Sequence, residues 1–251
     1  MSLRSWPSTA PAPETAAPQV TSPAPRTRNR LPTLWLVRHG ESTWNVAGLA
    51  QGHNDEAELT ERGLRQAAEA AAEFGYRPVR AIYASDLRRA QQTAAAFTEV
   101  LGLPVYADAR LRERSLGVLE GTAHSTIGPS ATGLADGLVI DPDARPPAGE
   151  SVRDLYLRAA AFCDDLAADL RDGRGALPCR TGPVPVNPVP VGTWPTSADG
   201  DVLVIAHGGT VRVLDAYARG VPVDQMTWRP VDNATIVRIC EFGTQLLGGN
   251  R

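Results

Sequence analysis

The sequence lacks the features that mark several specialised classes of protein. No apolar run approaches the ~20 residues that a membrane-spanning helix requires. The net charge is −3 over 251 residues, which argues against a strongly basic nucleic-acid binder and leaves no polybasic patch for a membrane surface. The three cysteines are widely spaced and form no CxxC pair that would indicate zinc or redox chemistry. We therefore expect reduced thiols, packed in the interior of a cytoplasmic protein.

Three segments of unusual composition define the expected domain organisation. Residues 1–30 are dominated by Ala, Pro, Ser and Thr, which predicts a disordered tail without the apolar core of a signal peptide. Residues 31–251 are expected to form a single domain. Within it, residues 122–149 predict a cap segment over the end of a sheet, and the proline-studded stretch 174–200 predicts an irregular surface insertion.

Short apolar runs alternate with helical patterns along the rest of the chain. The patterns predict strands over 34–38, 80–84, 103–106, 202–206 and 235–242, and helices over 60–74, 85–101, 151–170 and 210–219. The inner face of the 60–74 helix is expected to consist of Leu64, Ala67, Ala68 and Ala71. This order of elements predicts a three-layer α/β/α fold, with helices on both faces of a mostly parallel central sheet.

Two of the predicted buried strands end in the same way, with a histidine followed by glycine. The first ends at His39-Gly40, and the second, far along the chain, ends at His207-Gly208. Ligands of open α/β sheets bind beyond the carboxyl ends of the strands, and neighbouring strands lie ~4.8 Å apart. If these two strands are neighbours, both imidazoles reach one crevice and can touch a common ligand.

Two arginines are expected at the same crevice. Arg38 ends the first strand, and Arg88 begins the helix after the second strand along the chain. Guanidinium groups and helix N-termini both bind phosphate well, so a phosphoryl group explains this set most simply. A metal site is the chief alternative, but it would recruit carboxylates and there is no HxH or HExxH spacing. A serine hydrolase would need a Gly-x-Ser-x-Gly elbow, which is also missing.

The run Leu36-Val-Arg-His-Gly-Glu-Ser-Thr-Trp-Asn45 resembles the signature of the histidine phosphatase superfamily, the phosphoglycerate-mutase-like proteins. Further segments resemble that family in the expected order, namely Gln51-Gly52 and residues 59–67, 85–94, 111–121, 149–151 and 206–209. The resemblance spans residues 34 to about 240 and leaves out the tail and the 174–200 insertion.

The resemblance implies a role for each matching residue. His39 would attack phosphorus and carry a transient phosphohistidine, while Arg38, Arg88 and His207 would hold the phosphoryl oxygens. Glu113 would act as general acid and then as general base, which requires partial burial to hold its proton; its alternative role is a surface ion pair with Arg112 or Arg114. Residues of the substrate and phosphate site would be Asn45, Ser42, Gln51, Gly52 and Gly208. Neither a metal nor a cofactor is implied.

Within such a family the main choice is between a phosphatase and a mutase. Only 27 residues separate Gly121 from Gly149, and they are rich in small residues, which favours an open site and hydrolysis of a small phosphorylated metabolite. A cofactor-dependent phosphoglycerate mutase and a non-catalytic phosphate-binding protein remain the alternatives. The identity of the substrate, with specificity expected in residues 122–149, and the existence of a homodimer stay open.

Overall fold

The central sheet has five strands, of which four are parallel. We describe a computed structural model, which covers residues 32–171, 200–240 and 242. The sheet order is β3-β2-β6-β1-β7, and only β7 runs antiparallel to its neighbour. The strands are β1 (Leu34–Arg38), β2 (Val79–Ala84), β3 (Val105–Ala107), β6 (Asp201–Ala206) and β7 (Ile236–Ile239). The predicted mostly parallel sheet is confirmed, with β7 at its edge as expected.

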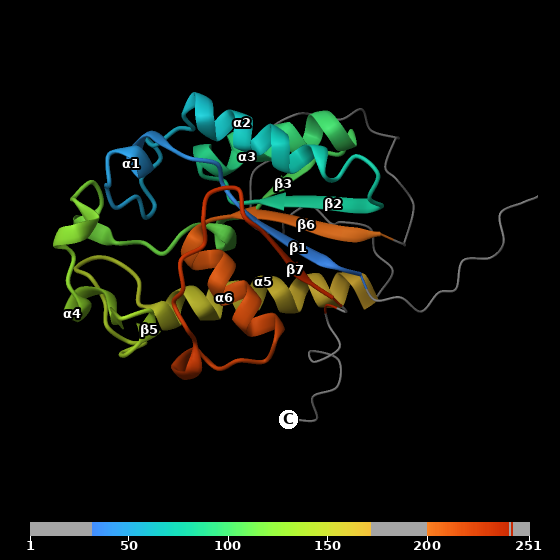
Figure 1. Cartoon of the computed structure of the whole chain (residues 1–251). Helices are drawn as coiled ribbons and strands as arrows, with labels where there is room; N and C mark the ends of the chain where they lie inside the picture. Colours follow the sequence, from blue (N-terminus) through green and yellow to red (C-terminus); the bar gives the residue numbers. More distant parts are fainter. Residues whose placement is uncertain (1–31, 172–199, 241, 243–251) are drawn as a thin grey trace, which may run out of the picture.

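Helices cover both faces of this sheet and complete the predicted three layers (Figure 1). The pair α2 (Glu61–Ala72) and α3 (Arg88–Leu101) lies on one face, and α5 (Val152–Arg171) and α6 (Gly208–Ala218) lie on the other. Alternate residues of the strands point to opposite faces, so Leu36 packs with the α5 and α6 side while Val37 packs with the α2 and α3 side. Each layer is therefore fixed by its own apolar core.

The connections above the carboxyl ends of the strands contain only short elements. They are α1 (Thr43–Val46), η1 (Ala109–Leu111), η2 (Gly117–Leu119), η3 (His124–Thr126), α4 (Pro129–Thr132), β4 (Leu134–Ala135), β5 (Leu138–Val139) and η4 (Val223–Gln225). Four of them, η3 to β5, lie in the predicted cap segment 122–149, where β4 and β5 form a small antiparallel hairpin. Among the described residues, no helix is both long and apolar enough to cross a membrane.

Several sequence-based expectations need correction. Leu64 and Ala68 are exposed on α2, because its buried face consists of Gly63, Ala67, Ala70 and Ala71. A side chain at Gly63 would meet the carbonyl oxygen of Glu41 at 2.0 Å, so α2 packs directly on the backbone that follows β1. Small residues at this contact, not leucine, allow that approach.

The remaining departures concern element ends and cysteines. The helix expected from Ser85 begins only at Arg88, since Ser85 Oγ accepts from the N–H of Leu87 in a turn before the helix. Cys163 is buried as expected, whereas Cys240 is exposed just after edge strand β7. Cys179, the predicted tail over 1–30 and the insertion up to residue 199 lie outside the described residues.

Candidate active site

The two strands that end in His-Gly are neighbours in the sheet. Strands β1 and β6 are parallel, with Arg38 opposite Ala206, so the next residue of each is a histidine at the same edge. The ring centroids of His39 and His207 lie 5.2 Å apart, and both residues are almost completely buried. The expectation that both imidazoles reach one crevice is therefore confirmed.

The hydrogen bonding of His39 determines which of its ring nitrogens is free to react. Nδ1 lies 2.7 Å from the carbonyl oxygen of Gly40, and a carbonyl can only accept, so Nδ1 carries the hydrogen. Nε2 then keeps its lone pair. Burial, together with the positive charges of Arg89 and Arg38, lowers the pKa of His39 well below its usual value. His39 is thus neutral at pH 7, in the form that a nucleophile requires.

His207 has a different environment. Neither of its ring nitrogens has a hydrogen-bond partner among the described residues, although both are buried. Burial lowers the pKa of His207 as well, with further contributions from Arg89 and His39. Buried polar atoms are normally hydrogen-bonded, so an imidazole in this state suits contact with a polar ligand.

The structure places Arg89, not Arg88, in the site. Arg89 is fully buried, and its guanidinium donates to the carbonyl oxygens of Asn54 and Gly52, both at 2.8 Å. Arg88 points outward, with its side chain 55% exposed and 2.7 Å from the carboxylate of Glu58. Successive residues of an α-helix are rotated by about 100°, so only one of the two arginines can face the crevice. The prediction took Arg88 from its place at the start of the helix and from the family resemblance, but it is Arg89 that lies on the buried face of α3, together with Thr93 and Phe97.

The Arg89 and Arg38 guanidinium groups are both held by backbone carbonyls. Burial lowers the pKa of Arg89 to about 10 and also lowers that of Arg38. Arg38 donates through Nη1 to the carbonyl oxygen of Val231, while its Nε is buried without a partner among the described residues. Both arginines stay charged at pH 7, and neither is ion-paired with a carboxylate in the described part of the chain.

Glu113 lies in the loop after η1 and lines the same cavity as His39. Its carboxylate accepts from the N–H of Arg114 at 2.8 Å and from the N–H of Gly209, at the start of α6, at 2.9 Å. A methyl group at position 209 would meet Glu113 Oε1 at 2.2 Å, so glycine is required for this approach. Glu113 is partly buried as expected, and the alternative surface ion pair is not formed, since Arg112 pairs with Asp86.

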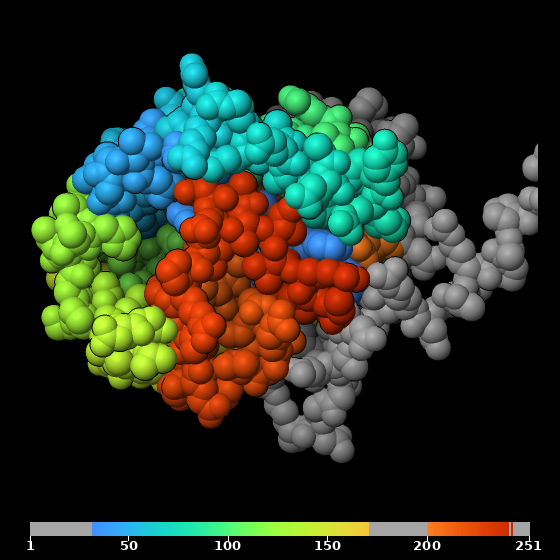
Figure 2. Space-filling model, in the orientation of Figure 1, coloured from blue at the N-terminus to red at the C-terminus, as the bar shows by residue number. Residues whose placement is uncertain are grey.

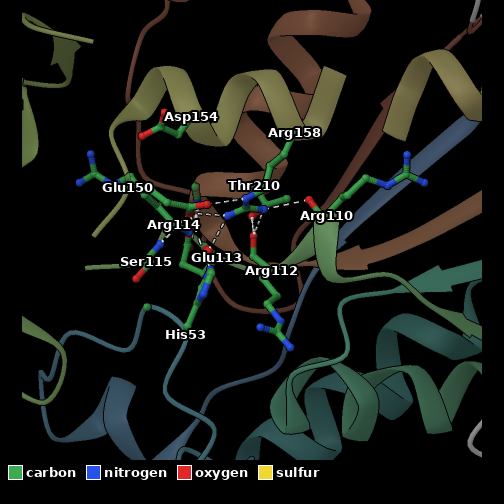
Figure 3. A network of polar contacts seen from close by, with 12 residues as sticks. His53, Arg110, Arg112, Glu113, Arg114, Ser115, Glu150, Asp154, Arg158 and Thr210 are labelled. Atoms are coloured by element: carbon green, nitrogen blue, oxygen red, sulfur yellow. Dashed lines mark hydrogen bonds and ion pairs between the residues drawn. The ribbon is translucent and has the colours of Figure 1, made fainter. Parts of the chain in front are cut away.

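A network behind Glu113 fixes the course of its loop (Figure 3). Arg158 of α5 contacts both carboxylate oxygens of Glu150, at 2.9 and 2.8 Å. The same guanidinium donates to the backbone carbonyl oxygens of Arg110, Arg112 and Glu113, at 2.7 to 2.9 Å. Glu150 also accepts from the N–H of Ser115 at 2.9 Å. One guanidinium therefore holds the segment 110–113 from inside the fold.

Asn45 is oriented by its neighbours. Its side-chain oxygen accepts from the N–H of Ser42 at 3.1 Å and from Asn233 Nδ2 at 3.1 Å, and Ser42 Oγ lies 3.0 Å away. Because the oxygen is occupied in this way, the amide NH2 of Asn45 is left to donate to a ligand. Ser42 is the N-cap of α1 and contacts the side chain of Asn45, but it does not line the cavity itself.

These side chains surround a cavity of about 160 Å³ between the strand ends and the cap segment. Figure 2 shows a hollow in the surface between the blue N-terminal part of the domain, the yellow-green cap segment and the red segment after α6. Of the predicted residues, the lining includes Arg38, His39, Asn45, Gln51, Gly52 and Glu113. His207, which lies beside His39, and Gly208 are not among the lining residues, and Arg88 points away to the surface.

Several lining residues were not predicted individually from the sequence, although His124, Thr132 and Leu134 lie in the segment 122–149 in which specificity was expected. The lining residues in question are Leu49, Arg89, Arg114, Leu116, His124, Thr132, Leu134, Gly209, Arg212 and Trp228. Arg212 lies one helical turn after Gly208, a spacing that places the two residues on one face of α6 and that could have indicated it. Trp228 and the supporting Asn233 belong to a segment without a recognisable pattern, which reaches the site only through the fold.

A model of the histidine phosphatase superfamily (branch 1) matches residues 34–179 and 193–245. The chain belongs to the histidine phosphatase superfamily. It is 34% identical over 190 residues to a glucosyl-3-phosphoglycerate phosphatase of Mycobacterium tuberculosis (strain H37Rv), covering 76% of each chain. It is 39% identical over 132 residues to a probable phosphoglycerate mutase of Yersinia pestis (strain Pestoides F), covering 52% of this chain and 61% of that one.

Solved structures of this superfamily share the fold. A mycobacterial glucosyl-3-phosphoglycerate phosphatase in complex with VO3 superposes with a TM-score of 0.65 at 33% identity, covering 84% of this chain and 90% of that one. A second structure, a protein of Bacillus stearothermophilus, superposes with a TM-score of 0.62 at 27% identity, covering 82% and 89%. The family resemblance predicted from the sequence motifs is confirmed.

Proposed function

We propose that the chain is a phosphatase that hydrolyses a small phosphomonoester through a phosphohistidine on His39, without a metal. The observation that carries this proposal is the state of His39, which is neutral, protonated on Nδ1 and free at Nε2 beside two arginines. Phosphoryl transfer depends mainly on positioning and charge stabilisation, and this set of residues supplies both. The named phosphatases among the relatives support the same reaction class.

The reaction divides into two transfers. In the first, Nε2 of His39 forms a bond to phosphorus while the bond to the leaving oxygen breaks, and Glu113 gives its proton to that oxygen. In the second, Glu113 takes a proton from water, whose oxygen attacks phosphorus and releases phosphate from His39. Arg38, Arg89, His207 and the amide of Asn45 donate to the phosphoryl oxygens throughout.

Hydrolysis is preferred over mutase activity because the cap segment contains only short elements. Between Gly121 and Gly149 the described elements are at most four residues long. A mutase must shield its phosphohistidine from water until the product takes the phosphoryl group. The mutase nevertheless remains the second candidate, because relatives named probable phosphoglycerate mutases match half of this chain.

The test is a phosphate-release assay on the purified full chain, with para-nitrophenyl phosphate and a panel that includes glucosyl-3-phosphoglycerate and the phosphoglycerates. We expect release of inorganic phosphate, unchanged by EDTA, and an acid-labile phosphoprotein after rapid quenching. Interconversion of 2- and 3-phosphoglycerate with negligible phosphate release would support the mutase instead. Phosphate binding without any phosphoprotein or turnover would support a non-catalytic protein.

Arg158 is expected to act on this reaction through Glu113. Arg158→Lys keeps the positive charge but loses the planar guanidinium, whose several N–H groups contact Glu150 and the carbonyl oxygen of Glu113 at the same time. We expect kcat for an alkyl phosphate, which needs a proton on its leaving group, to fall roughly 10- to 100-fold. For para-nitrophenyl phosphate, whose leaving group needs little help, kcat should fall less than about threefold.

A second arginine on α5 provides the control for this prediction. Arg153 forms ion pairs with Asp143 and Asp224 at the surface, away from Glu113, so Arg153→Lys should leave both rates unchanged. Equal losses for the alkyl and aryl phosphates in Arg158→Lys would show a general effect on folding and contradict the positioning role.

A further inference from the structure

The peptide bond between Gly40 and Glu41 connects the ring of His39 to helix α2. Its carbonyl oxygen, on Gly40, accepts from His39 Nδ1 at 2.7 Å, and its N–H, on Glu41, donates to Oε1 of Gln66 at 2.8 Å. Among the described residues, no other hydrogen bond holds either end of this peptide. Its orientation therefore depends on Gln66 on one side and on the imidazole on the other.

The peptide bond before it, between His39 and Gly40, is held by other residues. The carbonyl oxygen of His39 accepts from Asn233 Nδ2 at 3.1 Å, and the N–H of Gly40 donates to Oγ1 of Thr93, also at 3.1 Å. Thr93 is fully buried on α3. A change in the peptide that follows Gly40 leaves both of these contacts in place.

Rotation of the Gly40–Glu41 peptide would reverse the hydrogen bonding of the His39 ring. Glycine has no Cβ to oppose rotation of the peptide that follows it. A peptide turned over at this point would present its N–H to Nδ1 in place of its carbonyl oxygen, and an N–H can only donate. Nδ1 would then need its lone pair, and the ring hydrogen would move to Nε2, the atom that must attack phosphorus.

Helix α2 approaches this peptide closely enough to fix it. A methyl group at Gly63 would lie 2.0 Å from the carbonyl oxygen and 2.9 Å from the nitrogen of Glu41, and one at Gly40 would lie 2.3 Å from the carbonyl oxygen of Gly63. Gln66 comes three residues after Gly63, on the same side of α2, and is partly buried. Its amide oxygen thus reaches the Glu41 N–H from a helix that packs directly on the backbone.

We propose that Gln66 is a positioning residue that sets the tautomer of His39. This deepens the proposed function, on which it rests for the role of His39 as the nucleophile. By accepting from the N–H of Glu41, Gln66 keeps the carbonyl of Gly40 turned toward Nδ1, so that Nε2 retains its lone pair. Gln66 does not line the cavity formed by the described residues, so it acts through the backbone and not on the substrate.

The kinetic test compares Gln66→Met, which removes the acceptor at similar side-chain volume, with Gln66→Glu, which keeps an acceptor oxygen. In Gln66→Met the rate of phosphoprotein formation should fall roughly 3- to 10-fold, as expected for one lost hydrogen bond, while Kd for inorganic phosphate stays within about twofold. Gln66→Glu should recover most of that rate. Gln92→Met provides the control and should leave the rate unchanged, because Gln92 Oε1 makes an equivalent contact, 2.8 Å from the N–H of Leu59, away from Gly40.

Nitrogen NMR of isotopically labelled histidine rings measures the tautomer without any turnover, and so separates this proposal from the proposed reaction. The signals of His39 are those absent from the spectrum of His39→Asn. The ring hydrogen should lie on Nδ1 in the wild type and in Gln66→Glu, and mainly on Nε2 in Gln66→Met. An unchanged tautomer in Gln66→Met, or equal losses of phosphate affinity and rate, would overturn the positioning role. The expected change of tautomer in a protein that never forms a phosphoprotein would overturn only the phosphatase.

Discussion

Replacing Arg89 by methionine is expected to lower kcat/KM about 10³-fold, whereas the same change at the adjacent Arg88 should lower it less than about threefold. Arg89 is buried beside both histidines and is held by two backbone carbonyls, so it is already oriented when negative charge develops on the phosphoryl oxygens. Arg88 instead forms a half-exposed ion pair with Glu58. Exposed ion pairs of this kind contribute little to stability. Losing the pair between Arg88 and Glu58 should therefore leave the folded protein, and with it kcat/KM, almost unchanged.

The measurement is steady-state hydrolysis of para-nitrophenyl phosphate by the two variants. Because methionine at position 89 also removes a buried contact to Asn54 and Gly52, Arg89→Lys should be measured too, with thermal unfolding of each variant. Lysine keeps the charge but cannot donate to both carbonyl oxygens as the guanidinium does, so Arg89→Lys should recover only part of the lost kcat/KM. A larger loss of kcat/KM in Arg88→Met than in Arg89→Met would contradict the assignment of Arg89 to the phosphoryl site and would favour Arg88 instead.

The comparison of Arg88 with Arg89 shows what the sequence could and could not predict. The repeated His-Gly endings predicted that His39 and His207 meet if their two strands are neighbours, and the structure supplies that condition in the parallel pairing of β1 with β6. The choice between two adjacent arginines depends on which face of α3 packs on the sheet, and Arg89 shares the buried face with Thr93 and Phe97 whereas Arg88, rotated by about 100°, does not.

Arg158 and Asn233, which hold other residues of the site in place, could not be predicted from the sequence for a different reason. Arg158 holds the carbonyl oxygens of residues about 45 positions earlier in the chain, and Asn233 donates to Asn45 across the sheet edge. Neither contact leaves a periodic or spaced pattern in the sequence. Arg212 could have been predicted from the sequence, because its helical spacing from Gly208 places it beside the site. Only the fold, however, brings Trp228 and Arg114 next to it.

His39→Asn is expected to reduce turnover by at least about 10⁴-fold and to abolish the phosphoprotein, because the attacking atom itself is removed. The neighbouring His207 is the matched comparison, since both imidazoles are buried and their rings are 5.2 Å apart. His39 has its Nδ1–H fixed by Gly40 and so presents a lone pair on Nε2, whereas no described group fixes the tautomer of His207. His207→Asn should therefore slow both transfers while the phosphoprotein still forms.

Rapid quenching with a radiolabelled phosphomonoester, followed by mass spectrometry under alkaline conditions, measures both outcomes in one experiment. The label should map to the peptide that contains His39 in the wild type and in His207→Asn, and it should be absent in His39→Asn. Binding of inorganic phosphate should persist in His39→Asn, since Arg38, Arg89 and the amide of Asn45 remain in place. Label on the His207 peptide would reverse the two roles, because the tautomer of His39 would then not decide which imidazole attacks.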